Sequence, residues 1–191
     1  MILVVGLGNP GPRYAPTRHN AGFMLIDALA SGRVAAFQPR FAGDYAELQL
    51  GAARVGLLKP GTFMNESGRS VRAASSFFEL APEAVLVVHD ELDLALGELR
   101  LKVGGGDGGH RGLRSISAEL ASPEYARLRL GIGRPAPDFT GSVADFVLQA
   151  FALEERTELA SVLGRASEAV ELVVSDGLSR AMNRTNQRMV R

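Results

Sequence analysis

Short apolar runs along the chain predict six strands. The runs at residues 2–5 and 84–88 are wholly aliphatic, which is typical of strands buried on both faces of a sheet. Residues 99–103 alternate apolar and basic side chains, as a half-exposed strand does. Two further runs flank a turn at 51–53 and predict a hairpin. The predicted strands cover residues 2–5, 45–50, 54–58, 84–88, 99–103 and 128–133.

Between the strands, apolar positions recur at the spacing of amphipathic helices. Asn65 or Ser67 is placed to cap the second of these helices, and Gly177 separates the fourth from a last, basic helix. Strands that alternate with helices predict a three-layer α/β/α fold with a mixed, mostly parallel central sheet, in one domain over residues 1–191. The predicted helices cover residues 20–30, 65–80, 110–121, 153–175 and 178–191.

Composition narrows the class of protein. With 191 residues and 46% hydrophobic residues, the chain can bury an adequate core without cross-links. It contains no cysteine, which excludes a thiol nucleophile, a thiolate zinc site and a disulfide scaffold. No apolar run approaches the ~20 residues that cross a bilayer, and residues 1–6 lack the pattern of a signal peptide. We therefore expect a cytoplasmic protein that makes no membrane contact.

Charge is balanced overall but unevenly distributed. The net charge of zero argues against a nucleic-acid partner when it is taken alone. Residues 177–191, however, contain four arginines and no acid, whereas residues 144–176 contain seven acids and two arginines. The spacing of Arg180, Arg184 and Arg188 is also that of an ordinary solvated helix face. A net charge of zero is therefore compatible with a local basic surface.

A glycine-rich turn, G-x-G-x-x-G, follows the first predicted strand at residues 6–11. This motif raises the possibility of dinucleotide binding, but Pro10 and Pro12 delay the helix that should meet the pyrophosphate. The second predicted strand also lacks the acid that binds the ribose. A tight turn is the better interpretation, and it leaves Asn9 at the end of a buried strand, where open α/β sheets bind ligands.

The three histidines, His19, His89 and His110, each adjoin a strand end or a glycine-rich turn, with carboxylates nearby in the sequence. A required metal is not expected, because His89 and Asp90 point to opposite faces of a strand and no paired-histidine helix motif occurs. A serine nucleophile is not expected either, since the G-x-S-x-G motif is absent. The remaining route to hydrolysis is a histidine that acts as general base on water.

Such a base needs a carboxylate to orient it and amides to hold a substrate carbonyl. His19, one acid of the segment 89–93, Asn9 and Asn65 supply these groups. The spacing alone does not select among the acids of that segment.

Six segments stand out together: residues 6–11 with Tyr14, 17–22, 59–68, 89–94, 104–113 and 127–133. Together these segments resemble the bacterial peptidyl-tRNA hydrolase family. They occur in the family's order from residue 2 to about 148, and 176–178 with Met182 and Asn183 extends the resemblance toward the end of the chain. The resemblance implies hydrolysis of the ester that joins a peptide to the terminal ribose of tRNA, and we expect no cofactor or metal.

The resemblance also assigns roles to residues. His19 is implied as the general base for water, and the family motif selects Asp90 as the acid that orients it. The implied partner is peptidyl-tRNA, with no obligate protein partner, and we expect a monomer. The implied substrate-binding residues are Asn9 and Asn65 at the ester and its neighbours, Tyr14, Met64 and His110 along the cleft, and Lys102 and Arg129 on tRNA phosphates.

One position departs from the family pattern. Arg111 stands where members often carry asparagine, so that an amide that both donates and accepts becomes a cation that only donates. This chain therefore lacks the amide that would position substrate or water at residue 111, whereas an arginine can bind a phosphate at the tRNA end.

Two alternatives belong to other classes. The first is an RNA-binding protein on the same scaffold without hydrolase activity, and it has no need for Asn9, His19, Asn65 and Asp90 together. The second is a nucleotide-dependent enzyme that uses the first glycine turn, and a test of NAD binding distinguishes it.

Overall fold

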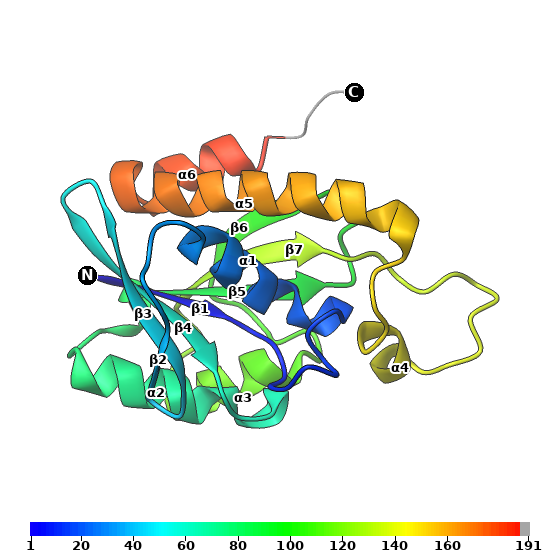
Figure 1. Ribbon diagram of the computed structural model, residues 1–191, viewed down its shortest axis with the longest axis horizontal. Helices are drawn as coiled ribbons and strands as arrows, with labels where there is room; N and C mark the ends of the chain where they lie inside the picture. The colour runs from blue at the N-terminus through cyan, green and yellow to red at the C-terminus, as the bar shows by residue number, and fades with distance from the viewer. Residues whose placement is uncertain (188–191) are drawn as a thin grey trace.

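A seven-stranded mixed sheet, with strand order β2-β3-β4-β1-β5-β7-β6, forms the centre of the computed structural model, which describes residues 1–187 (Figure 1). The four central strands β4, β1, β5 and β7 are mutually parallel, while β3 and β6 run antiparallel to their neighbours. The strands are β1 (Ile2–Gly6), β2 (Gln38–Arg40), β3 (Gly43–Leu50), β4 (Ala53–Pro60), β5 (Val85–Glu91), β6 (Leu99–Val103) and β7 (Ala126–Gly131).

Helices cover both faces of this sheet (Figure 1). One hydrophobic cluster lies under α1, α5 and α6, and a second lies under α2 and α3. The predicted three-layer α/β/α fold is therefore confirmed. The helices are η1 (Arg18–Asn20), α1 (Ala21–Ala30), η2 (Met64–Glu66), α2 (Ser67–Phe77), η3 (Pro82–Ala84), α3 (Arg111–Glu119), α4 (Val143–Val147), η4 (Leu153–Glu155), α5 (Arg156–Asp176) and α6 (Leu178–Thr185).

The aliphatic strand β1 supplies both clusters at once. Val4 packs into the cluster under α1, whereas Leu3 and Val5 pack into the cluster under α2 and α3. β1 and β5 are parallel neighbours, with Gly6 opposite Val88. Their carboxyl ends therefore meet at one edge of the sheet, which brings the chain after each strand close to the other.

Several predicted boundaries were wrong. Neither Asn65 nor Ser67 caps α2, because the tight turn η2 precedes it and Glu66 occupies the N-cap position without a side-chain bond. The short strand β2 and the helix α4 were missed, since each is too short to show a period. The predicted last helix ends at Thr185, and Arg188 and Arg191 lie outside the described residues.

The glycines of the first turn serve close packing between β1 and α1. A Cβ atom at Gly22 would collide with the backbone of Leu7 and with the carbonyl oxygen of Val88, and one at Gly6 would collide with the carbonyl oxygen of Gly22. A Cβ at Gly8 would lie 2.7 Å from the Phe23 ring. These contacts support the interpretation of the motif as a tight turn rather than a pyrophosphate site.

We expect Gly22→Ala to lower the free energy of unfolding by about 1–3 kcal/mol or more, because the added methyl group overpacks the contact between strand and helix. Gly164→Ala is the matched control: it lies in α5 with open space around its Cβ position, and alanine favours a helix by up to ~1 kcal/mol. Urea unfolding measures both. Equal stability of the two variants would contradict this account of the turn.

Candidate active site

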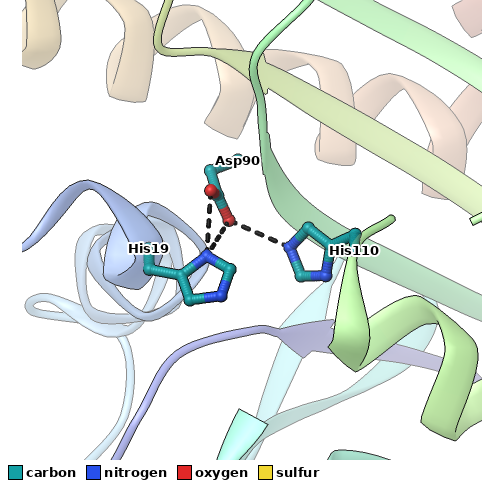
Figure 2. A group of neighbouring side chains, drawn as sticks. All are labelled: His19, Asp90 and His110. Atoms are coloured by element: carbon teal, nitrogen blue, oxygen red, sulfur yellow. Dashed lines mark hydrogen bonds and ion pairs between the residues drawn. The ribbon is translucent and has the colours of Figure 1, made fainter. Parts of the chain in front are cut away.

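His19 and Asp90 form the centre of the site. His19 lies on η1, and its Nδ1 atom is 2.9 Å from each carboxylate oxygen of Asp90, near the end of β5 (Figure 2). The side chain of Asp90 is only 3% exposed and that of His19 is 15% exposed. Because a carboxylate accepts hydrogen bonds, Nδ1 carries the proton, and Nε2 of His19 keeps its lone pair.

A second imidazole shares the same carboxylate. Nε2 of His110 lies 3.0 Å from Oδ1 of Asp90, and the ring centres of His19 and His110 are 4.9 Å apart (Figure 2). Burial alone would raise the pKa of Asp90, but the two imidazoles beside it outweigh burial and hold its pKa well below the ordinary value. Asp90 is therefore a charged acceptor between two donors.

The other acids of the segment 89–93 are engaged elsewhere. Glu91 pairs with Nε of Arg129 at 2.9 Å, and Asp93 pairs with Arg134 on the surface. Of the acids that the spacing left open, the structure therefore places only Asp90 against His19.

The turn that carries His19 is held in place by a segment distant in the sequence, residues 146–155. The guanidinium of Arg18 forms two hydrogen bonds with Glu155, at 3.0 and 2.7 Å, and lies over the rings of Phe146 and Phe151. Its backbone N–H donates to the carbonyl of Gln149. This planar, two-point contact is the kind that arginine provides and lysine does not. The segment from α4 to η4 thus holds the backbone on which His19 sits.

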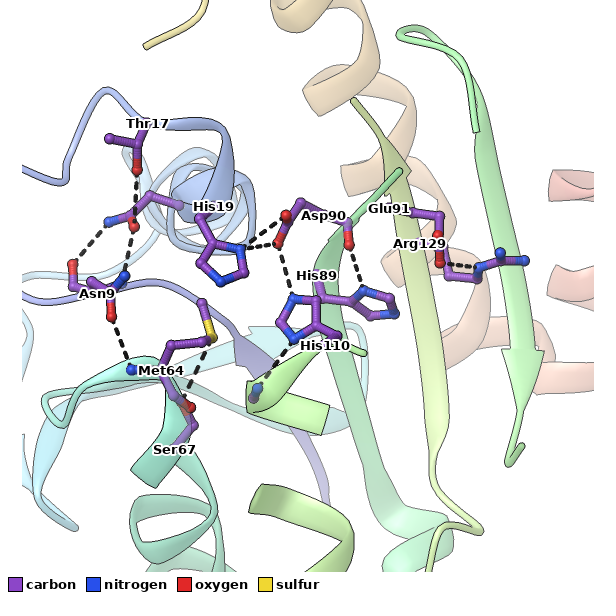
Figure 3. Close-up of polar contacts among 12 residues, drawn as sticks. Asn9, Thr17, His19, Met64, Ser67, His89, Asp90, Glu91, His110 and Arg129 are labelled. Atoms are coloured by element: carbon purple, nitrogen blue, oxygen red, sulfur yellow. Dashed lines mark hydrogen bonds and ion pairs between the residues drawn. The ribbon is translucent and has the colours of Figure 1, made fainter. Parts of the chain in front are cut away.

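Asn9 is held in a fixed orientation beside this pair. Its Oδ1 atom accepts the backbone N–H of Met64 at 2.9 Å, and the side chain of Asn20 bonds both to the N–H and to the carbonyl of Asn9 (Figure 3). Among residues 1–187, Nδ2 of Asn9 has no acceptor, so both of its N–H groups remain available. Sequence reasoning missed the role of Asn20, although the residue directly follows His19 in the family motif.

The remaining predicted cleft residues lie around this centre without bonding to it. Met64 is buried on η2 and Asn65 is exposed on the same turn. Tyr14 is partly buried under the guanidinium of Arg13, and Arg111 is the exposed first residue of α3. Within the described part of the chain, the side chains of Tyr14, Asn65 and Arg111 make no hydrogen bond to His19 or Asp90.

Lys102 and Arg129 lie on β6 and β7, the last two strands of the sheet, and the register sets Arg129 opposite His89 of β5. The register places Lys102 opposite Arg127 and Arg100 opposite Arg129. Burial, together with the neighbouring Arg127 and Arg129, lowers the pKa of Lys102. β6 and β7 therefore carry a concentration of positive charge, and Glu91 of β5 is bonded to Arg129 within it.

Arg127 has a structural role that the sequence did not reveal. It is 2% exposed, lies over the ring of Tyr125, and donates to the carbonyls of Gly105 and Gly106 at 2.7 Å each. The glycine loop that leads to His110 is thereby tied to β7. In the sequence, the alternation of Arg127 with leucines indicates a cation on one face of the strand. It does not reveal the buried carbonyl groups to which this cation donates.

The sequence pattern showed no set of metal ligands, but the fold brings one candidate set together. His19, Asp90 and His110 each offer a ligand atom, and these atoms lie within 4.8 Å of one another. The set was missed because its members come from three separate segments. Both facing nitrogens, however, already bond to the carboxylate, and a metal would have to replace the protons in those bonds. The donor set therefore fits a hydrogen-bonded base better than a metal centre.

A histidine oriented by a buried carboxylate, beside a fixed amide at the carboxyl edge of an α/β sheet, defines a hydrolase-type site. A sequence model described as peptidyl-tRNA hydrolase matches residues 3–191, and the chain belongs to this family. Its family and relatives indicate peptidyl-tRNA hydrolase activity, and they do not favour an RNA-binding protein without hydrolysis. Within the described residues, no helix has the length and apolar character needed to cross a membrane.

Proteins named peptidyl-tRNA hydrolase are similar over nearly the whole chain. One from Sorangium cellulosum is 51% identical and covers 98% of this chain and 85% of its own length. Another, from Symbiobacterium thermophilum, is 52% identical over 96% of this chain and 98% of its own. The crystal structure of peptidyl-tRNA hydrolase from Acinetobacter baumannii superposes with a TM-score of 0.90 at 42% identity, covering 98% of this chain and 95% of that one.

His89 contributes a pH dependence to stability. It is 2% exposed and its Nδ1–H donates to the carbonyl of Asp90, while burial is the main cause that lowers its pKa from 6.5 to about 3. Between these values the unfolded chain binds a proton that the folded protein does not bind. The free energy of unfolding should therefore fall as pH drops below about 6.5, by up to ~1.4 kcal/mol per pH unit.

We expect His89→Asn to remove this contribution, because asparagine can donate the same hydrogen bond but does not titrate. Urea unfolding of both proteins between pH 7 and pH 4 tests it: the stability advantage of the wild type should shrink as pH falls, since the other groups contribute equally to both. If the free energies of unfolding of the two proteins changed with pH in parallel, His89 would not be the source of this pH dependence.

Proposed function

We propose that His19 is the general base for hydrolysis of the ester between a peptide, or an N-blocked amino acid, and the terminal ribose of tRNA. The single observation that carries this proposal is the bond from Nδ1–H of His19 to Asp90, which directs the basic Nε2 atom away from the carboxylate. Asp90 is the positioning partner, and its charge stabilises the imidazolium that forms.

The reaction then balances with protein groups and water alone. Nε2 of His19 takes a proton from water as the water oxygen attacks the ester carbonyl carbon. The tetrahedral intermediate collapses with cleavage of the bond to the ribose oxygen, which receives the proton from His19. The products are a peptide carboxylic acid and tRNA with a free terminal hydroxyl, and stalled tRNA is thereby recycled.

Amides and the cleft hold the substrate for this step. The free Nδ2–H of Asn9 is the donor for the substrate carbonyl, since Met64 and Asn20 fix its side chain and backbone. The exposed amide of Asn65 binds the peptide or the terminal nucleotide, and Tyr14 and Met64 line the path. Of these residues, Asn9 is the best suited to hold the substrate carbonyl, because its orientation is fixed before substrate arrives.

Cations on the last two strands bind the tRNA backbone. Within the described residues, Arg129 uses only its Nε atom, for the pair with Glu91, which leaves its two terminal nitrogens available for phosphate. A phosphate near Lys102 would offset the repulsion from Arg127 and Arg129 that lowers its pKa. Arg111, exposed at the start of α3 and adjacent to His110, is placed to bind a phosphate of the tRNA end. These local cations supply the affinity that a net charge of zero does not.

The protein works in the cytoplasm, where ribosomes produce its substrate, as one domain over residues 1–191 and as a monomer without an obligate protein partner. No metal or other cofactor takes part. The single sheet to which both the site and the cations belong supports the one-domain arrangement.

We expect His19→Ala to lower the rate of tRNA release from N-blocked aminoacyl-tRNA by ~10² to 10⁴ with the fold retained, because general-base catalysis is lost. Asp90→Asn should lose less, since the imidazole remains but its tautomer is no longer enforced. Asp93→Asn is the matched control, because Asp93 is exposed and paired with Arg134, and it should keep full activity. Wild-type turnover in His19→Ala would exclude His19 as the base.

We expect the enzyme to keep its full rate in EDTA, because the facing nitrogens of His19 and His110 hold protons rather than a metal. The assay should use a small N-acyl-aminoacyl ester of adenosine, so that removal of magnesium does not unfold the substrate. A loss that zinc or magnesium restores would instead assign a metal to the group formed by His19, Asp90 and His110.

We expect Lys102→Ala and Arg129→Ala to weaken tRNA binding and to flatten its salt dependence by roughly 0.7–0.9 in the slope of log affinity against log salt per lost phosphate contact. Cleavage of the small adenosine ester should stay nearly unchanged, because that substrate lacks the phosphate backbone. Arg54→Ala, an exposed cation on β4, is the control and should leave both substrates unaffected. Equal loss on both substrates in the double variant would place the two cations in catalysis or folding instead.

A further inference from the structure

Both ring nitrogens of His110 are engaged, and by different kinds of partner. Its Nδ1 atom accepts the backbone N–H of Gly112 at 3.2 Å, which makes His110 the N-cap of α3. Its Nε2 atom faces Oδ1 of Asp90 at 3.0 Å (Figure 3). Accepting at Nδ1 uses the lone pair of that atom, and bonding to a carboxylate requires a proton on Nε2. The two contacts together specify one tautomer of a neutral ring.

We infer that the N-terminus of α3 holds His110 as a neutral hydrogen-bond donor to Asp90, which makes His110 a positioning residue for the pair of His19 and Asp90. This inference rests on the proposed function of that pair. The two imidazoles then have different roles. His110 keeps its proton in the hydrogen bond to Asp90, and only His19 takes up a proton from water.

The surroundings of His110 favour the neutral form. A proton on Nδ1 would break the bond from Gly112 and place a positive charge at the N-terminal end of a helix, where cations are unfavourable. The titratable groups that face the ring from other elements are Asp90 and His89 on β5 and His19 on η1. On its own loop and helix, Asp107 is bonded to Gly109 and Arg114, and Arg111 adds a positive charge.

A fixed second donor changes what Asp90 does. It occupies one carboxylate oxygen and shares its charge, so Asp90 binds the proton of an imidazolium less tightly than a carboxylate with one donor would. His19 can then return the proton to the leaving ribose oxygen more readily. The second bond also limits rotation of the carboxylate, which maintains the position of His19.

Two substitutions separate the contacts of His110. In His110→Gln, the side-chain N–H group stands near the position of Nε2 and can still donate to Asp90. In His110→Asn, the side-chain oxygen stands near the position of Nδ1 and still caps α3, as asparagine does well, but no donor reaches Asp90. Thermal unfolding of both proteins confirms that each is folded before the kinetics are compared.

We expect His110→Gln to keep kcat/KM within a few-fold of the wild type, with an unchanged pH profile. His110→Asn should lose roughly ten-fold or more, and the acidic limb of its profile should move to higher pH by about one unit, because a hydrogen bond to a charged group is lost. Equal shifts in the two variants would mean that the charge of His110 matters and not its donor. Unshifted profiles in both would mean that His110 only fills space.

The wild-type protein gives a second, independent measurement. Nitrogen-15 NMR of the imidazole rings should show His110 protonated at Nε2 and unprotonated at Nδ1 from neutral to mildly acidic pH. A proton on Nδ1 in this range would overturn the inference while leaving His19 as the base. Full activity of His19→Ala would contradict the proposed role of His19 as general base. The tautomer of His110 is measured by NMR independently of that result.

Discussion

A buried carboxylate is stable only with hydrogen-bond donors around it, and this requirement of Asp90 organises the site. Its side chain is 3% exposed, and its donors arrive from a turn near the N-terminus and from the loop before α3. Because leaving a buried charge unpaired is costly, the two contacts are expected to hold together whenever the protein is folded. The carboxylate that orients His19 therefore also ties three segments of the chain into one structure.

Two features of the fold bring these groups together: tight backbone packing between β1, β5 and α1, and the contact of Arg18 with a segment distant in the sequence. Parallel pairing of β1 with β5 places Asn9 and Asp90 at the same edge of the sheet, and Gly22 allows α1 to approach both strands. Arg18 then fixes the adjacent His19 through Glu155, which lies 137 residues away in the sequence. Rigid placement of a base and an amide before substrate arrives is the main contribution that such a scaffold makes to hydrolysis.

The histidine site and the cations of the last two strands belong to the same sheet. His19 and His110 meet Asp90 near the carboxyl end of β5, whereas Lys102 and Arg129 lie on β6 and β7, with Arg129 opposite His89 in the register. Between them, the glycine loop is held on β7 by Arg127 and leads into the N-cap of α3. β7 is thus connected through this loop to His110, which bonds to Asp90.

The sequence by itself determined the local features. Aliphatic runs predicted β1 and β5, because a strand buried on both faces shows its burial in its own residues. The family motifs singled out His19 and Asp90, but spacing alone left Glu91 and Asp93 as equal candidates. The tertiary structure brings Asp90 against His19 across 71 residues, as the family motif implied. Only the tertiary structure joined His110 to the same carboxylate and gave Arg18, Asn20 and Arg127 their roles. The physical reason is that hydrogen bonds between distant segments depend on how strands and helices pack, and packing leaves no period in the sequence of any one segment.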